Sequence, residues 1–149
     1  MQKEILLQIL DQSRNDCDRI TAKINNSNAV YRLTPQTASV GFIYRHIGEA
    51  TNVITQFFGF NNEIEATTLG QTDNGKHYDL EESRMLIDKA YSILEELIHE
   101  TSDSAWLEEI ETSLFGKLSR IKVFSITLFH ISHHCGQIAS AIVKGGKFQ

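Results

Sequence analysis

The sequence predicts an all-α protein, a four-helix bundle, on three observations. Its 149 residues include one proline and nine glycines, so long stretches contain no helix breaker. Four segments of roughly 20 residues carry apolar side chains at three- and four-residue spacing, the pattern of a helix that buries one face. The length suits one domain with its own core, so we expect residues 1–149 to form a single helical bundle domain.

The composition excludes several classes of protein. With 41% hydrophobic and 22% charged residues, the chain has an ordinary globular composition. Its net charge of −5 disfavours nucleic-acid binding, which needs a basic face. Apolar runs such as residues 5–7 are too short for a membrane span or a signal-peptide core. We therefore expect a cytoplasmic protein with no membrane partner, whose two cysteines are reduced thiols.

The first two helices are predicted from their stripes and their ends. The first helix runs from about Lys3 to about Lys23, and the turn-forming residues 25–28 stop it. For the second, Thr34 is the expected N-cap and Pro35 the first helical residue, because proline fits that position. It should continue to about residue 58, where Gly59 can close it.

A link over residues 59–78, rich in asparagine, threonine and glycine, separates the second helix from the third. It is long enough to cross the bundle, so the third helix need not run antiparallel to the second. Asp79 and Glu82 form an aspartate version of the capping box at the start of the third helix, which should end near Glu100.

The fourth helix follows a second link, over residues 101–118, that contains Trp106. Ser119 is the expected N-cap, and the helix should run to about Val143, with Gly145 as the stop signal. No acidic residue occurs after Gly116. Any carboxylate that assists the histidines of this helix must therefore come from elsewhere in the fold.

Two histidines of the fourth helix have the spacing of a metal-binding pair. His130 and His134 are four residues apart, which places their side chains on one helix face with Cβ atoms roughly 5–6 Å apart. His133 points about 100° away from His134 and cannot easily share the same ion. Both members of the pair border the apolar stripe, so we expect them to face inward. The alternative is that they are hydrogen-bonded core residues.

A third inward histidine, His46, lies in the middle of the stripe of the second helix. Three neutral imidazoles suit zinc, nickel, cobalt, iron or copper, and they leave a coordination position open for water or substrate. We therefore expect a catalytic metal centre on His46, His130 and His134, with zinc or nickel as the foremost metals. Glu49 could accept a ring N–H from His46, or it could be a solvated side chain.

The sequence does not identify a general base or any other catalytic residue. The stretch from His130 to His134 lacks the glutamate that follows the first histidine in zincin proteases. No Gly-x-Ser-x-Gly motif or dinucleotide-binding fingerprint occurs either. Four other residues, Tyr44, His77, Tyr78 and Trp106, could line a pocket or could simply pack.

The histidines also carry a resemblance. A histidine in the middle of the second helix, followed by His130-x-x-x-His134-x-Gly136-Gln137 on the last helix, resembles the DinB/YfiT-like superfamily over the whole chain. The resemblance implies an up-down-down-up bundle, a divalent metal on three histidines, and a homodimer. Some relatives are transferases that join a low-molecular-weight thiol, such as bacillithiol, to an electrophile.

The resemblance suggests a metal-dependent thiol transferase or a hydrolase that acts on a small molecule. The alternative is a non-catalytic, stress-associated dimer whose histidines bind metal incidentally or pack in the core. Independently, four apolar residues lie off the histidine stripe of the second helix and suggest a dimer surface: Val40, Phe42, Ile47 and Ile54.

The two cysteines do not point to a reactive thiol. Relatives often carry a basic residue where this chain has Cys135, which puts an anionic substrate in doubt. Cys135 falls in the apolar stripe of the fourth helix, so we expect a buried core residue. Cys17 lies between Asp16 and Asp18, which should raise its pKa.

Overall fold

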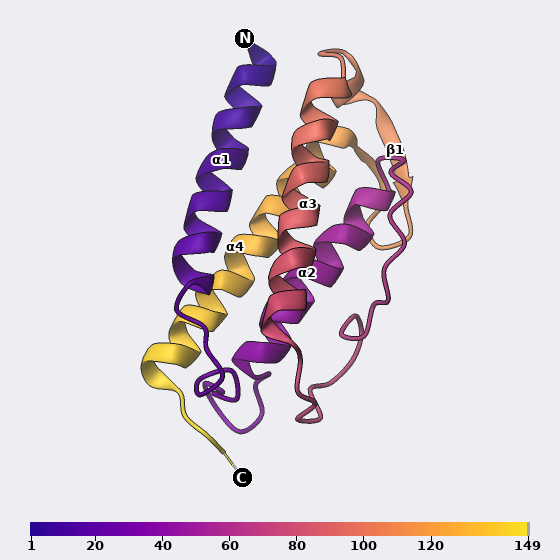
Figure 1. The fold of residues 1–149 in the computed structure, drawn as a ribbon. Helices are drawn as coiled ribbons and strands as arrows, with labels where there is room; N and C mark the ends of the chain where they lie inside the picture. The colour runs from indigo at the N-terminus through magenta and orange to yellow at the C-terminus, as the bar shows by residue number, and fades with distance from the viewer. Residues whose placement is uncertain (149) are drawn as a thin grey trace.

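The computed structural model describes residues 1–148, which form four long helices, one short 3₁₀ helix and one β-hairpin (Figure 1). The prediction of a four-helix fold is confirmed. In chain order the elements are α1 (Gln2–Thr21), α2 (Val40–Gln56), α3 (Leu80–Glu100), η1 (Ala105–Leu107), β1 (Glu109–Thr112), β2 (Gly116–Ser119) and α4 (Arg120–Lys144).

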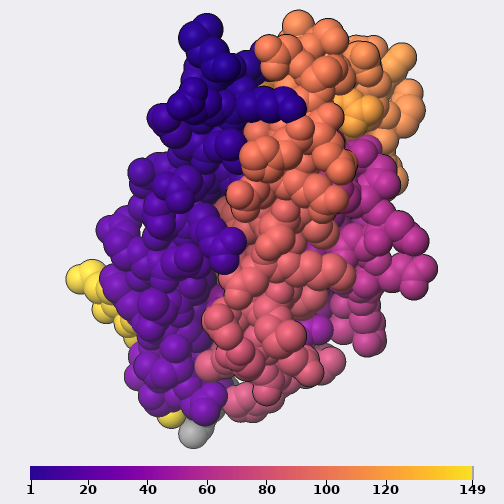
Figure 2. All heavy atoms as spheres, turned by 45° about the horizontal axis from the view of Figure 1, so that its top comes forward, coloured from indigo at the N-terminus to yellow at the C-terminus, as the bar shows by residue number. Residues whose placement is uncertain are grey.

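Helices α1 and α4 run in one direction, and α2 and α3 run in the opposite one (Figure 1). Lys3, near the start of α1, donates a hydrogen bond to the carbonyl of His99 near the end of α3. Arg45 of α2 pairs with Glu82 of α3, and both lie in the first part of their helices. Figure 2 shows α1 and α3 side by side along one face of the molecule.

The core lies between the apolar stripes of the four helices. Trp106 of η1 is fully buried and packs edge-on against Phe124 of α4, with 5.4 Å between the ring centroids. Tyr91 of α3 is also buried, and its hydroxyl hydrogen-bonds that of Ser13 on α1 at 3.0 Å. The second link therefore contributes its tryptophan to the bundle core.

The apolar residues off the histidine stripe of α2 belong to this core. Val40 and Ile47 are completely buried, and Phe42 and Ile54 are nearly so. The prediction that these four side chains form a dimer surface is wrong. Helix α3 packs closely on α2, and Phe42 lies against His46 and Tyr78.

Thr34 and Pro35 do not begin α2, contrary to the prediction. They lie in a turn in which the N–H of Thr37 donates to the carbonyl of Thr34. The N-cap is Ser39, whose hydroxyl accepts the N–H of Phe42 at 3.3 Å.

The later start has a cause in the backbone. The N–H groups of Val40 and Gly41 donate to the carbonyls of Tyr31 and Ala29. In a helix that began at Pro35, the same two N–H groups would bond to carbonyls four residues earlier. The preceding loop takes these donors, so the helix begins after them.

The predicted ends of the last two helices are confirmed. Asp79 caps α3 by accepting the N–H of Glu82 at 2.8 Å, and that helix ends at Glu100. Ser119 occupies the N-cap position of α4, although its side chain makes no capping hydrogen bond. Helix α4 ends at Lys144, followed by Gly145.

The link over residues 101–118 contains regular structure that the sequence did not suggest. Strands β1 and β2 pair antiparallel, with Glu109 opposite Ser119 and Thr112 opposite Gly116. Gly116 has a φ of +70°, which suits glycine in the tight turn. The hairpin leads directly into α4 and so fixes where that helix begins.

The link over residues 59–78 has no helix or strand, as predicted, but it is anchored at several points. Asn62 donates to the side-chain oxygen of Asn52 on α2 at 2.6 Å. Asp73 accepts the N–H of Ser39 at 2.7 Å and pairs with Arg32 at 2.9 Å. These bonds hold the link along α2, where the histidine of that helix lies.

Across residues 1–148, the helices are too short or too polar to pass through a bilayer.

Candidate metal centre

The structure brings together the three histidines that the sequence singled out. His46 projects from α2, while His130 and His134 project from successive turns of α4. One ring nitrogen of each lies within 4.8 Å of one from each of the others. All three side chains are partly buried. Residues 84 positions apart in the chain thus converge on one point between two helices.

The spacing of the rings suits a small metal ion. The Nε2 atoms of His130 and His134 are 3.1 Å apart. The ring centroid of His46 lies 5.3 Å from that of His130 and 4.8 Å from that of His134. Zinc–nitrogen bonds of about 2.0–2.1 Å place two nitrogens of a tetrahedral site roughly 3.3 Å apart. Small side-chain rotations would therefore bring all three nitrogens to that spacing.

The three imidazoles are neutral at neutral pH, as metal ligands must be. Burial, followed by the nearby His134 ring, lowers the pKa of His46 to about 4. The same two causes lower the pKa of His130 to about 3. Burial also lowers the pKa of His134. Because the three rings do not easily take up protons, their nitrogen lone pairs stay available to a metal ion.

Two of the three rings are oriented by a hydrogen bond at their Nδ1 atom. The Nδ1 of His46 lies 3.2 Å from the hydroxyl of Thr68, and the Nδ1 of His134 lies 2.7 Å from the side-chain oxygen of Gln137. The Nδ1 of His130 is buried and has no hydrogen-bond partner within the described chain. Contacts of this kind fix ring orientation and tautomer in metal sites. The donor set therefore fits a transition metal on the Nε2 side of the rings.

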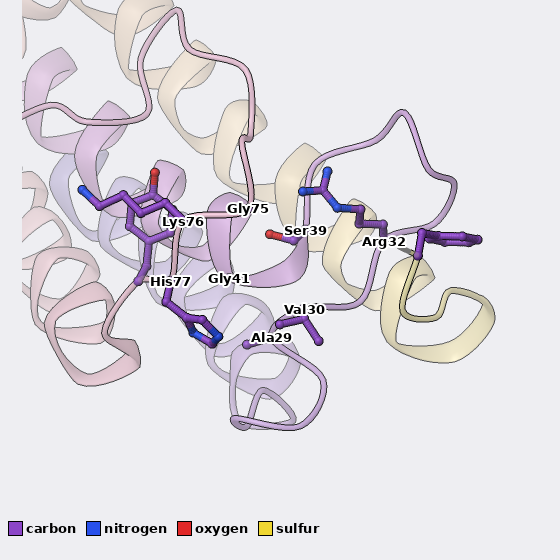
Figure 3. Close-up of a pocket in the computed structure, with 10 residues that line it drawn as sticks. Ala29, Val30, Arg32, Ser39, Gly41, Gly75, Lys76 and His77 are labelled. Atoms are coloured by element: carbon purple, nitrogen blue, oxygen red, sulfur yellow. The ribbon is translucent and has the colours of Figure 1, made fainter.

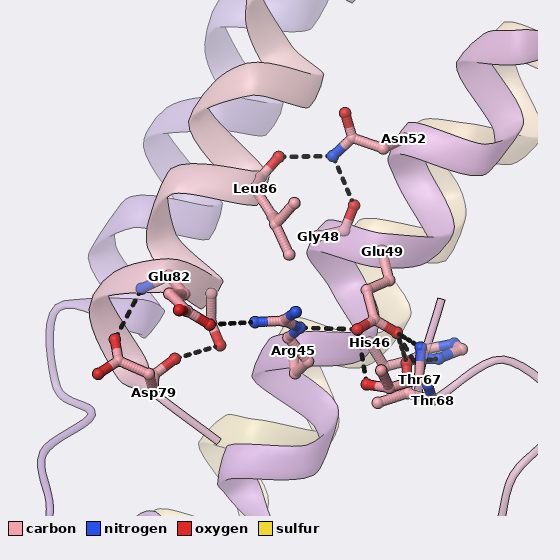
Figure 4. A network of polar contacts seen from close by, with 11 residues as sticks. Arg45, His46, Gly48, Glu49, Asn52, Thr67, Thr68, Asp79, Glu82 and Leu86 are labelled. Atoms are coloured by element: carbon pink, nitrogen blue, oxygen red, sulfur yellow. Dashed lines mark hydrogen bonds and ion pairs between the residues drawn. The ribbon is translucent and has the colours of Figure 1, made fainter. Parts of the chain in front are cut away.

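Glu49 does not contact His46, contrary to one of the two expectations for it, and it is not solvated either. It is fully buried, and its two oxygens accept five hydrogen bonds (Figure 4). Arg45 donates one of them at 2.7 Å, and Thr67 and Thr68 donate two each, from backbone and side chain.

These bonds determine the charge of Glu49. Burial alone would raise the pKa of its carboxyl group, but the bonds from Arg45, Thr68 and Thr67 outweigh burial and lower that pKa. Glu49 is therefore an ionised anchor for the link over residues 59–78. It reaches the histidine cluster only through Thr68, which contacts both side chains.

His133 stays outside the cluster, as the helix geometry predicted. Its side chain is exposed and lies along the ring of Phe129, with 6.3 Å between the centroids. On the other side of the cluster, Phe42 stacks on His46 at 6.4 Å, and Tyr78 meets Phe42 edge-on. Aromatic residues of α2 and the first link thus form one wall beside the three rings.

A cavity of about 530 Å³ lies between the loop before α2, α2 and α4; His133 lines it, and none of the three clustered histidines does. Its lining includes Ile43 of α2, one turn before His46, and Gln137 of α4, which also bonds to His134. The remaining lining is mainly apolar, with Leu33 and Ala38 from the loop before α2. The cavity is large enough for a small organic molecule.

A second cavity, of about 230 Å³, lies at the start of α2 and does not include the three histidines (Figure 3). His77 and Tyr78 line it, so these two of the four candidate pocket residues do face a hollow. Its arginine, Arg32, is already paired with Asp73. The other two candidates, Tyr44 and Trp106, are buried in the core.

Both cysteines are free and buried, and Cys135 is a core residue as predicted. The pKa of Cys17 is raised, mainly by a hydrogen bond with the Cys135 thiol and by burial. The neighbouring Asp18, which the sequence suggested as a cause, contributes less. Cys17 therefore remains a protonated thiol inside the bundle.

The sequence analysis did not identify Arg45, Thr67 or Thr68 as parts of this site. Arg45 stands four residues before Glu49, a spacing that favours an ion pair on a helix and was available as a signal. The two threonines lie in an irregular link without periodicity. Only the tertiary fold places them against α2.

One of two comparisons with known proteins identifies a family. A search of curated proteins found no match to the chain. The sequence profile of the DinB superfamily matches residues 9–138, which include all four long helices in whole or in large part and all three histidines. The resemblance drawn from the histidine pattern is thereby confirmed, and the chain belongs to the DinB superfamily.

Proposed function

We propose that this protein is a metal-dependent enzyme in which His46, His130 and His134 hold one divalent transition metal ion, zinc or nickel. The observation that carries the proposal is the convergence of three neutral imidazoles from two helices within 4.8 Å. Three protein ligands leave a coordination position open, which is typical of catalytic rather than structural sites.

Zinc or nickel bound there would lower the pKa of a coordinated thiol or water and so provide a nucleophile near neutral pH. The chain itself supplies binding and orientation. Thr68 and Gln137 orient the rings of His46 and His134. Glu49 is engaged in five hydrogen bonds, so its role is to hold Thr68 rather than to accept a substrate proton.

The organic part of the substrate would bind in the cavity of about 530 Å³ that is lined by Gln137, the hydrogen-bond partner of His134. Its lining is mainly apolar and contains hydroxyl, amide and imidazole groups but no lysine or arginine. This favours an uncharged substrate with an apolar body. A thiol transfer to such an electrophile, or its hydrolysis, is the reaction class that we propose.

The test is a screen of low-molecular-weight thiols against uncharged electrophiles, with the zinc-loaded and the nickel-loaded protein. We expect turnover with at least one pair, lost after metal removal and lost in His130→Ala. Exposed His99 on α3 offers the matched control, and His99→Ala should retain the activity. Ser140→Phe, which fills the cavity, should raise KM while the metal content stays unchanged.

Full metal content with no turnover of any thiol or of any hydrolysable electrophile would contradict catalysis. That result would favour the alternative of a non-catalytic bundle that binds metal. Turnover that persists in His130→Ala would contradict the assignment of the site.

A further inference from the structure

The hydroxyl of Thr68 lies between the Glu49 carboxylate and the His46 ring (Figure 4). Its Oγ1 is 2.7 Å from Oε2 of Glu49 and 3.2 Å from Nδ1 of His46. Thr68 is buried, so no bulk water competes for either contact. The direction of both hydrogen bonds can be worked out by counting hydrogens.

A threonine hydroxyl has one hydrogen to donate and two lone pairs that accept. An ionised carboxylate can only accept, and Glu49 is already paired with Arg45 at 2.7 Å. The hydrogen of Thr68 must therefore lie in its short contact with Glu49. The contact with His46 is then possible only if the ring donates, so Nδ1 of His46 carries a proton.

A neutral imidazole carries one ring proton. With that proton on Nδ1, the Nε2 of His46 has a free lone pair. Because Nδ1 is hydrogen-bonded to Thr68, Nε2 is the ring nitrogen that is available to face His130 and His134. The hydrogen-bond chain from Arg45 through Glu49 and Thr68 thus ends in a lone pair directed at the histidine cluster.

We propose that Thr68 is a positioning residue that fixes His46 as the Nδ1–H tautomer and thereby presents Nε2 as a metal ligand, with Glu49 setting the direction of the Thr68 hydroxyl. The metal-binding part of this inference rests on the proposed function, whereas the tautomer does not. The link over residues 59–78, which follows α2 and is remote in sequence from α4, then takes part in assembling the site.

The backbone of the link is held firmly enough to serve this role. Both Thr67 and Thr68 donate their backbone N–H to Oε2 of Glu49 at 2.8 Å. Thr67 also donates its hydroxyl to the other oxygen, Oε1, at 2.8 Å. Each threonine therefore donates one backbone N–H and one hydroxyl to the same carboxylate, and only Thr68 also contacts His46.

This difference provides a matched pair of variants. Thr68→Val and Thr67→Val each remove one hydroxyl bond to Glu49, but only the first removes the acceptor for His46. Thr68→Ser keeps the hydroxyl and should behave as the wild type. Thermal unfolding of all three establishes that the variants are folded.

The first measurement is the tautomer of His46 in metal-free protein, from the ¹⁵N chemical shifts of its ring nitrogens at pH 7. Wild type, Thr67→Val and Thr68→Ser should show a protonated Nδ1 and a bare Nε2. In Thr68→Val the Nδ1 proton has no acceptor, so the Nε2–H form should become populated. A wild-type His46 protonated on Nε2 overturns the proposal without reference to any variant.

The second measurement is zinc affinity, by competition with a chelator. We expect a loss of about 10–100-fold in Thr68→Val, the usual effect of removing such a partner. Thr67→Val and Thr68→Ser should stay close to the wild type. Equal losses in the two valine variants would overturn the specific role of Thr68. If the wild type binds no zinc, the proposed function fails, while the tautomer measurement still decides the inference about Thr68.

Discussion

His46, His130 and His134 are kept neutral by their surroundings, which is the main feature of the protein at the scale of single residues. Burial and mutual proximity hold the pKa of His46 at about 4 and that of His130 at about 3. The ordinary value for histidine is about 6.5. The difference makes both folding and metal binding depend on pH in a predictable direction.

In the metal-free protein, the free energy of unfolding should fall as the pH drops from about 6.5 to about 4. Because the unfolded chain takes up these protons first, acid favours unfolding, by at most about 1.4 kcal/mol per pH unit for each histidine. Urea unfolding at several pH values measures the slope. His130→Ala lacks one of these groups and should show a smaller slope; an equal slope would contradict the lowered pKa.

Metal binding should persist to lower pH than an ordinary histidine allows. Protons compete with the metal only where the folded protein takes them up, and for His46 and His130 that is near pH 4 and below. The rise in melting temperature caused by zinc should therefore remain large at pH 5. A rise that disappears between pH 7 and pH 6 would show that the ligands are protonated at their ordinary pKa.

At the scale of elements, the close packing of α2 on α3 sets the position of His46. Gly48 lies two residues after that histidine. Of the two glycines of α2, it is the one that lies against α3. A Cβ atom at this position would lie 2.6 Å from the Cβ of Leu86 and 3.3 Å from backbone atoms of residues 83 and 87. The Cβ of Leu86 is bonded directly to the backbone of α3, so it cannot move aside without a shift of that helix.

Gly48→Ala should therefore destabilise the protein by about 1–3 kcal/mol, the usual cost of overpacking. Gly136 of α4 is the matched control, because a Cβ there meets no atom within 4 Å. Gly136→Ala should stabilise the protein by about 0.5–1 kcal/mol, since alanine favours the helix. Chemical denaturation of both variants measures this contrast, and similar effects in the two would contradict the close approach of α2 and α3.

The elements also show what the sequence could and could not predict. Sequence signals sufficed where a helix end is set by neighbouring residues: Asp79 caps α3, as its spacing with Glu82 predicted. They failed at Pro35, because the backbone of residues 29–31 takes the donors that would start an earlier helix. The histidines could be found because helix periodicity fixes their faces. Thr68 could not, since only tertiary contacts place it beside His46.

At the scale of the whole molecule, the homodimer remains a prediction, and it needs a different surface from the one first considered. Two exposed apolar side chains, Ile9 of α1 and Phe129 of α4, border a groove of about 500 Å³ between these helices. A second copy of the chain packed on this face would bury both.

Light scattering at micromolar concentration should return about twice the chain mass of 16.9 kDa. Ile9→Glu should shift the protein to the monomer, because it places a charge in the contact. Met85→Glu is the control, since Met85 is an exposed apolar residue on α3, away from the groove. A wild-type particle of 16.9 kDa would contradict the dimer, and dissociation by both variants would contradict the choice of face.

The central claim is that three histidines from two helices bind one metal ion, and the metal content of the untagged protein tests it most directly. Elemental analysis after zinc or nickel reconstitution should give about one ion per chain in the wild type and in His133→Ala. His46→Ala, His130→Ala and His134→Ala should each lose stoichiometric metal, because each removes one of three converging ligands. A wild type that retains no metal, or equal metal content in all four variants, would contradict the account.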